Sequence, residues 1–196
     1  NLQNIPTGIQ SFQVRAAFVP PHDQVFVSAD YSQIELRVLA YLSQDAALKK
    51  AFDEDKDIHT ETAAGLFNVS SEEVDGSMRG LAKKINFSIL YGLSPYGLSK
   101  DLNIPFKDAK VYIERYFEQY PGVVSWMDSV IEDAKKHGYV TTLFGRRRYV
   151  PGIYEKNKNL FELARRIAIN KVVQVTAAEL MKNGMLRLEA TLPERE

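Results

Sequence analysis

The sequence contains no cysteine, which excludes disulfide bonds, thiolate metal sites and a cysteine nucleophile. It also has no excess of either charge, because its 25 basic and 25 acidic side chains cancel over 196 residues. Nucleic-acid binding would therefore need a local concentration of positive charge. No apolar run approaches the roughly 18–20 residues of a membrane span, and the polar residues 1–4 lack the apolar core of a signal peptide. We therefore expect no membrane partner and a cytoplasmic location.

The remaining composition, 45% apolar and 26% charged, is typical of a globular chain. Residues 1–24 are expected to be irregular, and residues 25–29 predict one short strand. Hydrophobic periodicity with start and stop residues then predicts a series of helices and one β-hairpin, so the expected fold class is α+β and mainly α-helical. The expected helices lie at about 34–42, 45–52, 58–67, 71–75, 77–91, 95–102, 106–119, 122–137 and 160–190, and the hairpin strands at 139–143 and 146–150.

A carboxylate, Asp30, stands where the predicted strand gives way to a helix. Such a position suits a catalytic carboxylate, and a hard cation such as Mg²⁺ takes one or two carboxylates together with substrate phosphates. From the local sequence alone, a turn or helix-capping residue is the favoured interpretation of Asp30. Ser32 and Glu35 have the spacing of a capping box, in which Glu35 bonds back to the Ser32 amide.

A basic and aromatic stripe recurs at four-residue spacing in the helix expected at 77–91, formed by Arg79, Lys83, Phe87 and Tyr91. Positive donors bind a triphosphate, and flat rings stack on a base, so a nucleotide lying along this face would use all four side chains. The alternative is an amphipathic helix with solvated cations and buried rings. Asn86 is interpreted as an ordinary surface residue.

A polar stripe, Arg166, Asn170 and Gln174, lies in the long helix expected at 160–190. These side-chain types bond base edges and sugars, although the stripe could also be the solvent face of a core helix. The expected apolar surface of this helix includes Leu160 and Leu163.

Three of these segments together resemble the family A DNA polymerases, the bacterial DNA polymerase I group. Residues 30–37, Asp-Tyr-Ser-Gln-Ile-Glu-Leu-Arg, are similar to motif A of that family. Residues 79–92, Arg-x3-Lys-x3-Phe-x3-Tyr-Gly, are similar to motif B. Residues 1–6, 57–60 and 143–148 also resemble family segments.

The resemblance implies templated addition of dNTPs to a primer 3′-hydroxyl by two-metal phosphoryl transfer. Asp30 would be a catalytic metal ligand for Mg²⁺, with the backbone carbonyl of Tyr31 as a further ligand. Glu35 would exclude a ribose 2′-hydroxyl. The implied nucleotide-binding residues are Gln33, Glu35, His59, Arg79, Lys83, Phe87 and Tyr91, and the implied primer–template contacts are Arg166, Asn170 and Gln174.

The same resemblance predicts the domain organisation. Residues 1–31 would be a partial palm carrying the motif A strand, residues 32–192 the fingers, and residues 193–196 a tail. The helix at about 77–91 would bind nucleotide and that at about 160–190 primer–template DNA. The family's motif C, which carries a second metal-binding aspartate, has no counterpart in the sequence; we interpret the only His-Asp pair, His22-Asp23, as a turn.

Because motif C is absent, we expect a DNA polymerase fragment that is inactive alone. The alternatives are a non-catalytic chain that binds nucleotide or DNA, and one half of a split polymerase whose partner is the missing portion. A single-subunit RNA polymerase is disfavoured by Phe87 and Glu35 in the sugar-facing positions. A purely structural module is a further alternative.

Overall fold

The computed structural model describes residues 17–192. The chain divides into two units, Asn1–Ser32 and Gln33–Glu196. The motif-like segment at residues 1–6 and the tail at 193–196 lie outside the described residues, as does most of the predicted partial palm.

The described part of the first unit contains extended chain and turns. Residues 22–23 form a turn, as predicted, with Asp23 at φ 63° and the Gln24 amide donating to the Pro21 carbonyl at 3.1 Å. The predicted strand at residues 25–29 is wrong, because this segment is loop and not part of a sheet. A strand is stabilised by hydrogen bonds to a neighbouring strand, and the one sheet among residues 17–192 is the hairpin described below.

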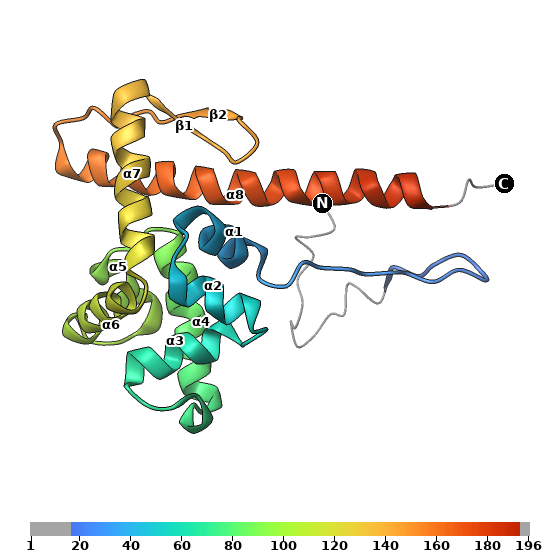
Figure 1. Cartoon of the computed structure of the whole chain (residues 1–196), viewed down its shortest axis with the longest axis horizontal. Helices are drawn as coiled ribbons and strands as arrows, with labels where there is room; N and C mark the ends of the chain where they lie inside the picture. Colours follow the sequence, from blue (N-terminus) through green and yellow to red (C-terminus); the bar gives the residue numbers. More distant parts are fainter. Residues whose placement is uncertain (1–16, 193–196) are drawn as a thin grey trace. The chain divides into compact units, whose positions relative to one another are not determined.

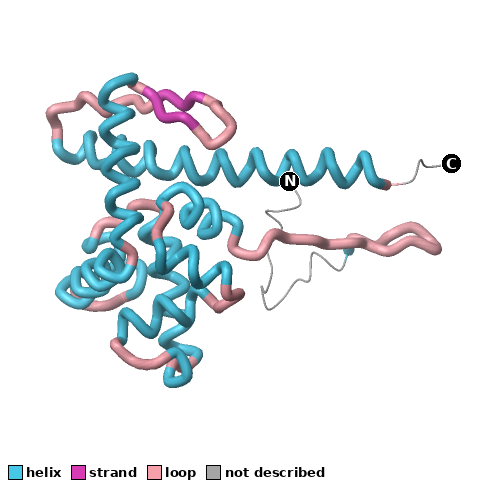
Figure 2. The backbone as a smooth tube through the Cα atoms, in the orientation of Figure 1, coloured by secondary structure: helices cyan, strands magenta, loops and turns pink. Residues whose placement is uncertain are grey.

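The second unit confirms a mainly α-helical fold with one antiparallel hairpin, as Figures 1 and 2 show. In the hairpin, Tyr139 pairs with Tyr149 and Thr141 with Arg147. The elements are α1 (Ile34–Ser43), α2 (Ala46–Asp53), α3 (Ile58–Phe67), the 3-10 turn η3 (Ser71–Glu73), α4 (Gly76–Leu90), α5 (Pro95–Leu102), α6 (Phe106–Gln119), α7 (Pro121–His137), β1 (Tyr139–Thr141), β2 (Arg147–Tyr149) and α8 (Lys158–Thr191).

Local signals account for several of these boundaries. Ser70 and Glu73 form the predicted capping box, and Gly138 ends α7 at φ 76°, a left-handed conformation that favours glycine. Helix α1 begins at Ile34, as predicted. Its N-cap is Gln33, which has φ 55° and makes no side-chain capping bond.

The long helix α8 packs against α1 and α7. Its buried side is mostly small, with Ala164, Ala168 and Val173 all at most 1% exposed. Leu160 and Leu163, predicted on the apolar face, are 48% and 45% exposed, so that part of the prediction is wrong. Small side chains allow α8 to pack closely against its neighbours. The prediction instead chose the larger leucines because it was based on hydrophobicity alone.

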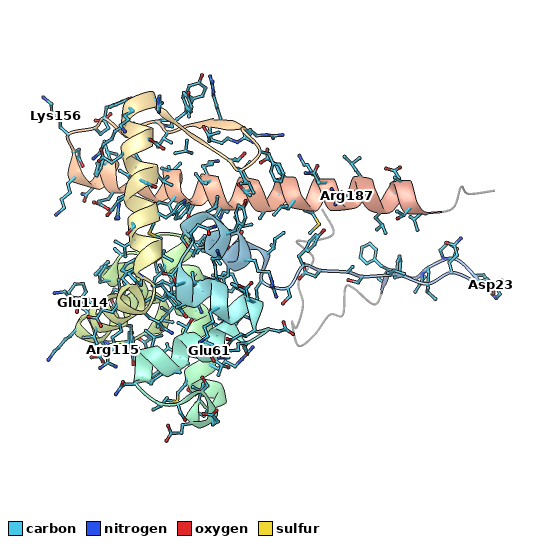
Figure 3. All side chains as sticks on the ribbon, viewed as in Figure 1. Asp23, Glu61, Glu114, Arg115, Lys156 and Arg187 are labelled. Atoms are coloured by element: carbon cyan, nitrogen blue, oxygen red, sulfur yellow. The ribbon has the colours of Figure 1, made fainter. Side chains whose placement is uncertain are left out.

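The C-terminal half of α8 extends beyond the other helices of the second unit (Figure 1). Figure 3 labels Arg187 on this half. Apolar side chains here are exposed, namely Met185, Leu186, Leu188 and Leu192. Across residues 17–192, no helix combines the length and apolarity required to cross a membrane.

Candidate nucleotide-binding site

Helix α4 carries the predicted stripe along one side. Arg79 and Lys83 are exposed on its N-terminal half, Phe87 is half-buried, and Tyr91 is 38% exposed at the C-cap. The rings of Phe87 and Tyr91 are stacked, with centroids 6.4 Å apart and planes at 23°. Two cations are thus followed by a pair of rings, the order that a phosphate and a base would need.

An open groove of about 1030 Å³ runs along this side of α4. Lys83, Phe87 and Tyr91 line it from α4, and α5 forms the facing part of the lining. Its other lining residues are Gly80, Lys84, Ser88, Leu93, Gly97, Lys100 and Asp101. The groove has the size of a small-molecule site, and three lysines make it electropositive.

The N-terminus of α3 lies against the N-terminal half of α4. Asp57 caps α3, its Oδ1 accepting from the His59 amide at 2.9 Å, and its Oδ2 forms an ion pair with Arg79 Nε. Burial alone would raise the pKa of Asp57. The hydrogen bonds from Arg79 and the His59 amide outweigh this effect, so the pKa is lowered. Because Arg79 is held through Nε, the pair leaves the terminal guanidinium nitrogens available for an anion.

The side chain of His59 is buried rather than displayed, at 2% exposure. Its ring lies 6.0 Å from that of Phe87, and its Nδ1 lies 3.1 Å from Asn86 Nδ2. Burial, with the nearby charges of Arg79 and Lys83, lowers the pKa of His59, against the opposing effect of Asp57. The predicted triphosphate contact of His59 remains a prediction, and the imidazole that would make it is neutral.

Glu35 on α1 reaches the end of the stripe. Its carboxylate accepts a hydrogen bond from the Tyr91 hydroxyl at 3.0 Å. Burial and the Glu35 charge raise the pKa of Tyr91, so the phenol keeps its proton at neutral pH. A carboxylate is thus fixed beside the ring that would lie next to the sugar and base.

Helix α8 meets α4 at the same point. Asn170 Nδ2 donates to the Tyr91 carbonyl at 3.3 Å, while Asn170 Oδ1 is buried with no partner. Gly92 has φ 69°, and a Cβ there would lie 2.6 Å from Cγ of Arg166, so the arginine stem packs directly on the glycine. Gln174 is exposed further along α8. The predicted nucleotide and primer–template helices therefore meet at Tyr91 and Gly92.

The predicted metal ligands Asp30 and Tyr31 belong to the other unit, so the structure does not place them in this site. Among residues 17–192, no group of three His, Asp or Glu side chains could hold a metal ion. One carboxylate and one carbonyl do not make a two-metal site. The described residues therefore do not fit the Mg²⁺ pair that the family resemblance implies.

Two residues of this site were missed or misassigned from the sequence. Asn86, interpreted as a surface residue, is 0% exposed. Asn86 lies at helical spacing from Ala82 and Ile89, which are buried on α4. This spacing could have predicted that Asn86 is buried too. Asp57 received no role, although an Asp before a helix start is a typical N-cap; its pairing with Arg79 joins residues 22 apart and has no local signal.

This mainly helical fold, with its cation-and-ring helix meeting one long helix, is that of a nucleic-acid polymerase domain. The chain belongs to DNA polymerase family A, whose family model matches residues 1–196. It is 50% identical over 196 residues to DNA polymerase I of Bacillus caldotenax and 52% identical over 195 residues to the thermostable DNA polymerase I of Thermus thermophilus.

A solved structure supports the same assignment of fold. The POL domain of Pol1 from M. smegmatis, in complex with DNA primer-template and dNTP, matches with a TM-score of 0.78 and 40% identity, over 82% of this chain and 28% of that one. The two relatives named above are covered over 99% of this chain but only 22% and 24% of their own length. The chain thus spans about a quarter or less of these polymerases.

Proposed function

We propose that this chain is the palm–fingers portion of a DNA-directed DNA polymerase, and that it binds the incoming dNTP on α4 and the primer–template on α8. Residues 1–31 would contribute part of the palm and residues 32–192 the fingers. The observation that carries the proposal is the convergence at Tyr91, where the ring pair of α4, Glu35 of α1 and Asn170 of α8 meet.

The triphosphate would lie at the N-terminal half of α4. Arg79 and Lys83 are exposed there, and His59 would add a neutral donor from the adjoining α3. The sugar would rest on Phe87 and the base beside Tyr91, since stacking on aromatic rings accepts any base. Gln33, the N-cap of α1 in a left-handed conformation, would also contact the nucleotide.

Discrimination against ribonucleotides would come from Glu35. Its hydrogen bond with Tyr91 holds the carboxylate in place, so a 2′-hydroxyl would meet a fixed group. Arg166, Asn170 and Gln174 would contact the primer–template near its growing end. DNA and dNTPs are the partners that this arrangement requires, and a cytoplasmic location follows because both are found there in bacteria.

The chemical step would need metal-binding carboxylates beyond Asp30. We propose that they come from another part of the polymerase, so that this chain binds its substrates without joining them. The test is primer extension by the purified 196-residue chain with Mg²⁺ and then Mn²⁺, beside Asp30→Ala. We expect no extension from a chain that circular dichroism shows to be folded. Extension that Asp30→Ala abolishes would contradict the proposed incomplete site.

A further inference from the structure

A buried cluster of polar side chains lies beneath the candidate triphosphate site, between α3 and α4. It consists of His59 and Thr62 from α3, Asn86 from α4, and Tyr120 at the start of α7, each at most 2% exposed. Buried polar groups cost free energy unless their hydrogen-bonding capacity is used. The positions of the donors and acceptors therefore restrict where each proton can be.

The Thr62 hydroxyl has one proton to give. Its Oγ1 lies 2.7 Å from the Ile58 carbonyl oxygen, which can only accept, so the proton is donated there. Oγ1 is then an acceptor toward the Tyr120 hydroxyl at 3.0 Å and Asn86 Nδ2 at 3.1 Å. Asn86 Oδ1, an acceptor like Oγ1, also lies near it, at 3.2 Å. With its proton given to Ile58, Oγ1 has a favourable contact with the amide nitrogen of Asn86 and none with the amide oxygen.

The Asn86 amide nitrogen has two protons. One is donated to Thr62, and the other is directed at His59 Nδ1, 3.1 Å away. Nδ1 facing a donor must itself accept and carry no proton. A neutral imidazole then has its proton on Nε2.

We propose that Asn86, oriented by Thr62, is a positioning residue that keeps His59 as the neutral Nε2–H tautomer, so that the ring offers a triphosphate oxygen a hydrogen-bond donor and not a cation. The choice of ligand rests on the proposed function. With Nδ1 occupied by Asn86, Nε2 is the only ring nitrogen left for a ligand. Without its proton, Nε2 would repel the phosphate.

The charges around the ring are consistent with this assignment. Asp57 is an anion that acts on the ring, and its oxygens accept from the His59 amide and from Arg79 Nε. The positive charges of Arg79 and Lys83 on α4 disfavour protonation of the His59 ring to a cation. Tyr120 reaches the ring only through Thr62 and Asn86. Protonation of Nδ1 would place two donors face to face at 3.1 Å.

The test is a long-range ¹H–¹⁵N spectrum of the 196-residue chain labelled with ¹⁵N at histidine. The ring of His59 is assigned by its disappearance in His59→Gln, and His22 and His137 are reference rings in the same sample. We expect one His59 tautomer, protonated at Nε2, throughout the pH range in which free imidazole titrates. In Asn86→Asp the new carboxylate can only accept a hydrogen bond, so we expect Nδ1 of His59 to become protonated and to donate to it.

A ligand titration separates this inference from the proposed function. Isothermal titration with dATP should show affinity falling about tenfold in Asn86→Leu, the loss of one oriented charge-assisted hydrogen bond. Thr62→Ser keeps the hydroxyl and should retain both tautomer and affinity. Ser99→Ala, a buried hydroxyl in α5 that bonds only the Tyr96 carbonyl, is the control for loss of a buried polar group.

Three outcomes would overturn the inference: an Nδ1–H or mixed His59 tautomer, no change in Asn86→Asp, or unaltered dATP affinity in folded Asn86→Leu. If the wild-type chain shows the Nε2–H tautomer but no dATP binding, the positioning of the ring is supported, and it is the proposed function and the triphosphate role of His59 that fail.

Discussion

At the scale of single residues, the candidate site depends on polar groups that hold one another in place. Asp57 holds Arg79, Asn86 holds His59, and Tyr91 holds Glu35. In the first two pairs one member is a candidate ligand contact and the other fixes its direction, while in the third both members are candidate contacts. A site preorganised in this way loses less conformational entropy when ligand binds.

The Glu35–Tyr91 pair yields a prediction about sugar selection. Glu35→Ala removes the carboxylate that would face a 2′-hydroxyl, so affinity for ATP should rise about tenfold relative to dATP, a change of about 1.4 kcal/mol. Tyr91→Phe keeps the ring but releases Glu35, and should give a smaller change in the same direction. Competition titrations of dATP with ATP measure both ratios. An unchanged ratio in Glu35→Ala would remove Glu35 from the site.

The lowered pKa of His59 predicts a pH dependence of stability. Its folded pKa lies below the ordinary value of 6.5, so between the two values the unfolded chain binds more protons than the folded one. The free energy of unfolding therefore falls as the pH drops below about 6.5 toward the folded pKa, and is unaffected by this group above that range.

Urea denaturation of wild type and His59→Gln at pH 7 and pH 5 measures this effect. The difference in unfolding free energy between the two pH values should be smaller in His59→Gln. Equal differences in the two proteins would show that His59 binds protons alike in the folded and unfolded chains.

At the scale of elements, the helices that form the site were predictable, while their contacts were not. The sequence predicts α3, α5 and α6 at their observed bounds, because capping residues and prolines mark those boundaries locally. The strand at residues 25–29 was predicted wrongly, since strand formation depends on a neighbour that local sequence does not reveal. The stripe of α4 follows from four-residue spacing, but its meeting with Glu35 and Asn170 depends on tertiary packing.

The junction of α2 and α7 is an example of a tertiary contact that local sequence does not reveal. Asp45 is 2% exposed, and its carboxylate accepts from the amides of Ala47, Leu48 and Gly122. One buried carboxylate thereby caps α2 and binds the first turn of α7. Gly122 is required there because a Cβ would lie 2.8 Å from the Asp45 Cα.

Substitution of two glycines tests this packing. Gly122→Ala should lower the free energy of unfolding by about 1–3 kcal/mol, the usual cost of overpacking. Gly80→Ala is the matched control within α4, where a Cβ meets nothing within 4 Å. It should stabilise by about 0.5–1 kcal/mol through reduced backbone entropy of the unfolded chain. Urea titrations measure both; a neutral Gly122→Ala would contradict the described close approach.

At the scale of the whole molecule, the chain exposes large apolar side chains on its longest described helix, α8. Leu186 and Leu188, on different sides of the helix, make the C-terminal half of α8 apolar at its surface. The chain covers less than a quarter of the length of the two DNA polymerase I relatives. The sequence predicted the family from its motifs. It did not predict these exposed apolar positions, because exposure depends on which part of α8 the other helices cover.

We predict that this apolar surface makes the isolated chain self-associate. Leu186 and Leu188 are 64% and 60% exposed, and exposed apolar patches promote association. Sedimentation velocity should show concentration-dependent association of the wild-type chain, and Leu186→Lys with Leu188→Lys should shift it toward monomer. Lys136→Ala on α7 is the control for altered charge. Association that the double variant leaves unchanged would contradict the prediction.

The central claim, that α4 binds an incoming nucleotide in this chain, is tested most directly by isothermal titration with dATP. We expect wild type to bind, Lys83→Ala to bind about tenfold more weakly through loss of one charge-assisted contact, and Lys136→Ala to match wild type. Equal affinity in all three proteins, or no binding to a folded wild-type chain, would contradict the account.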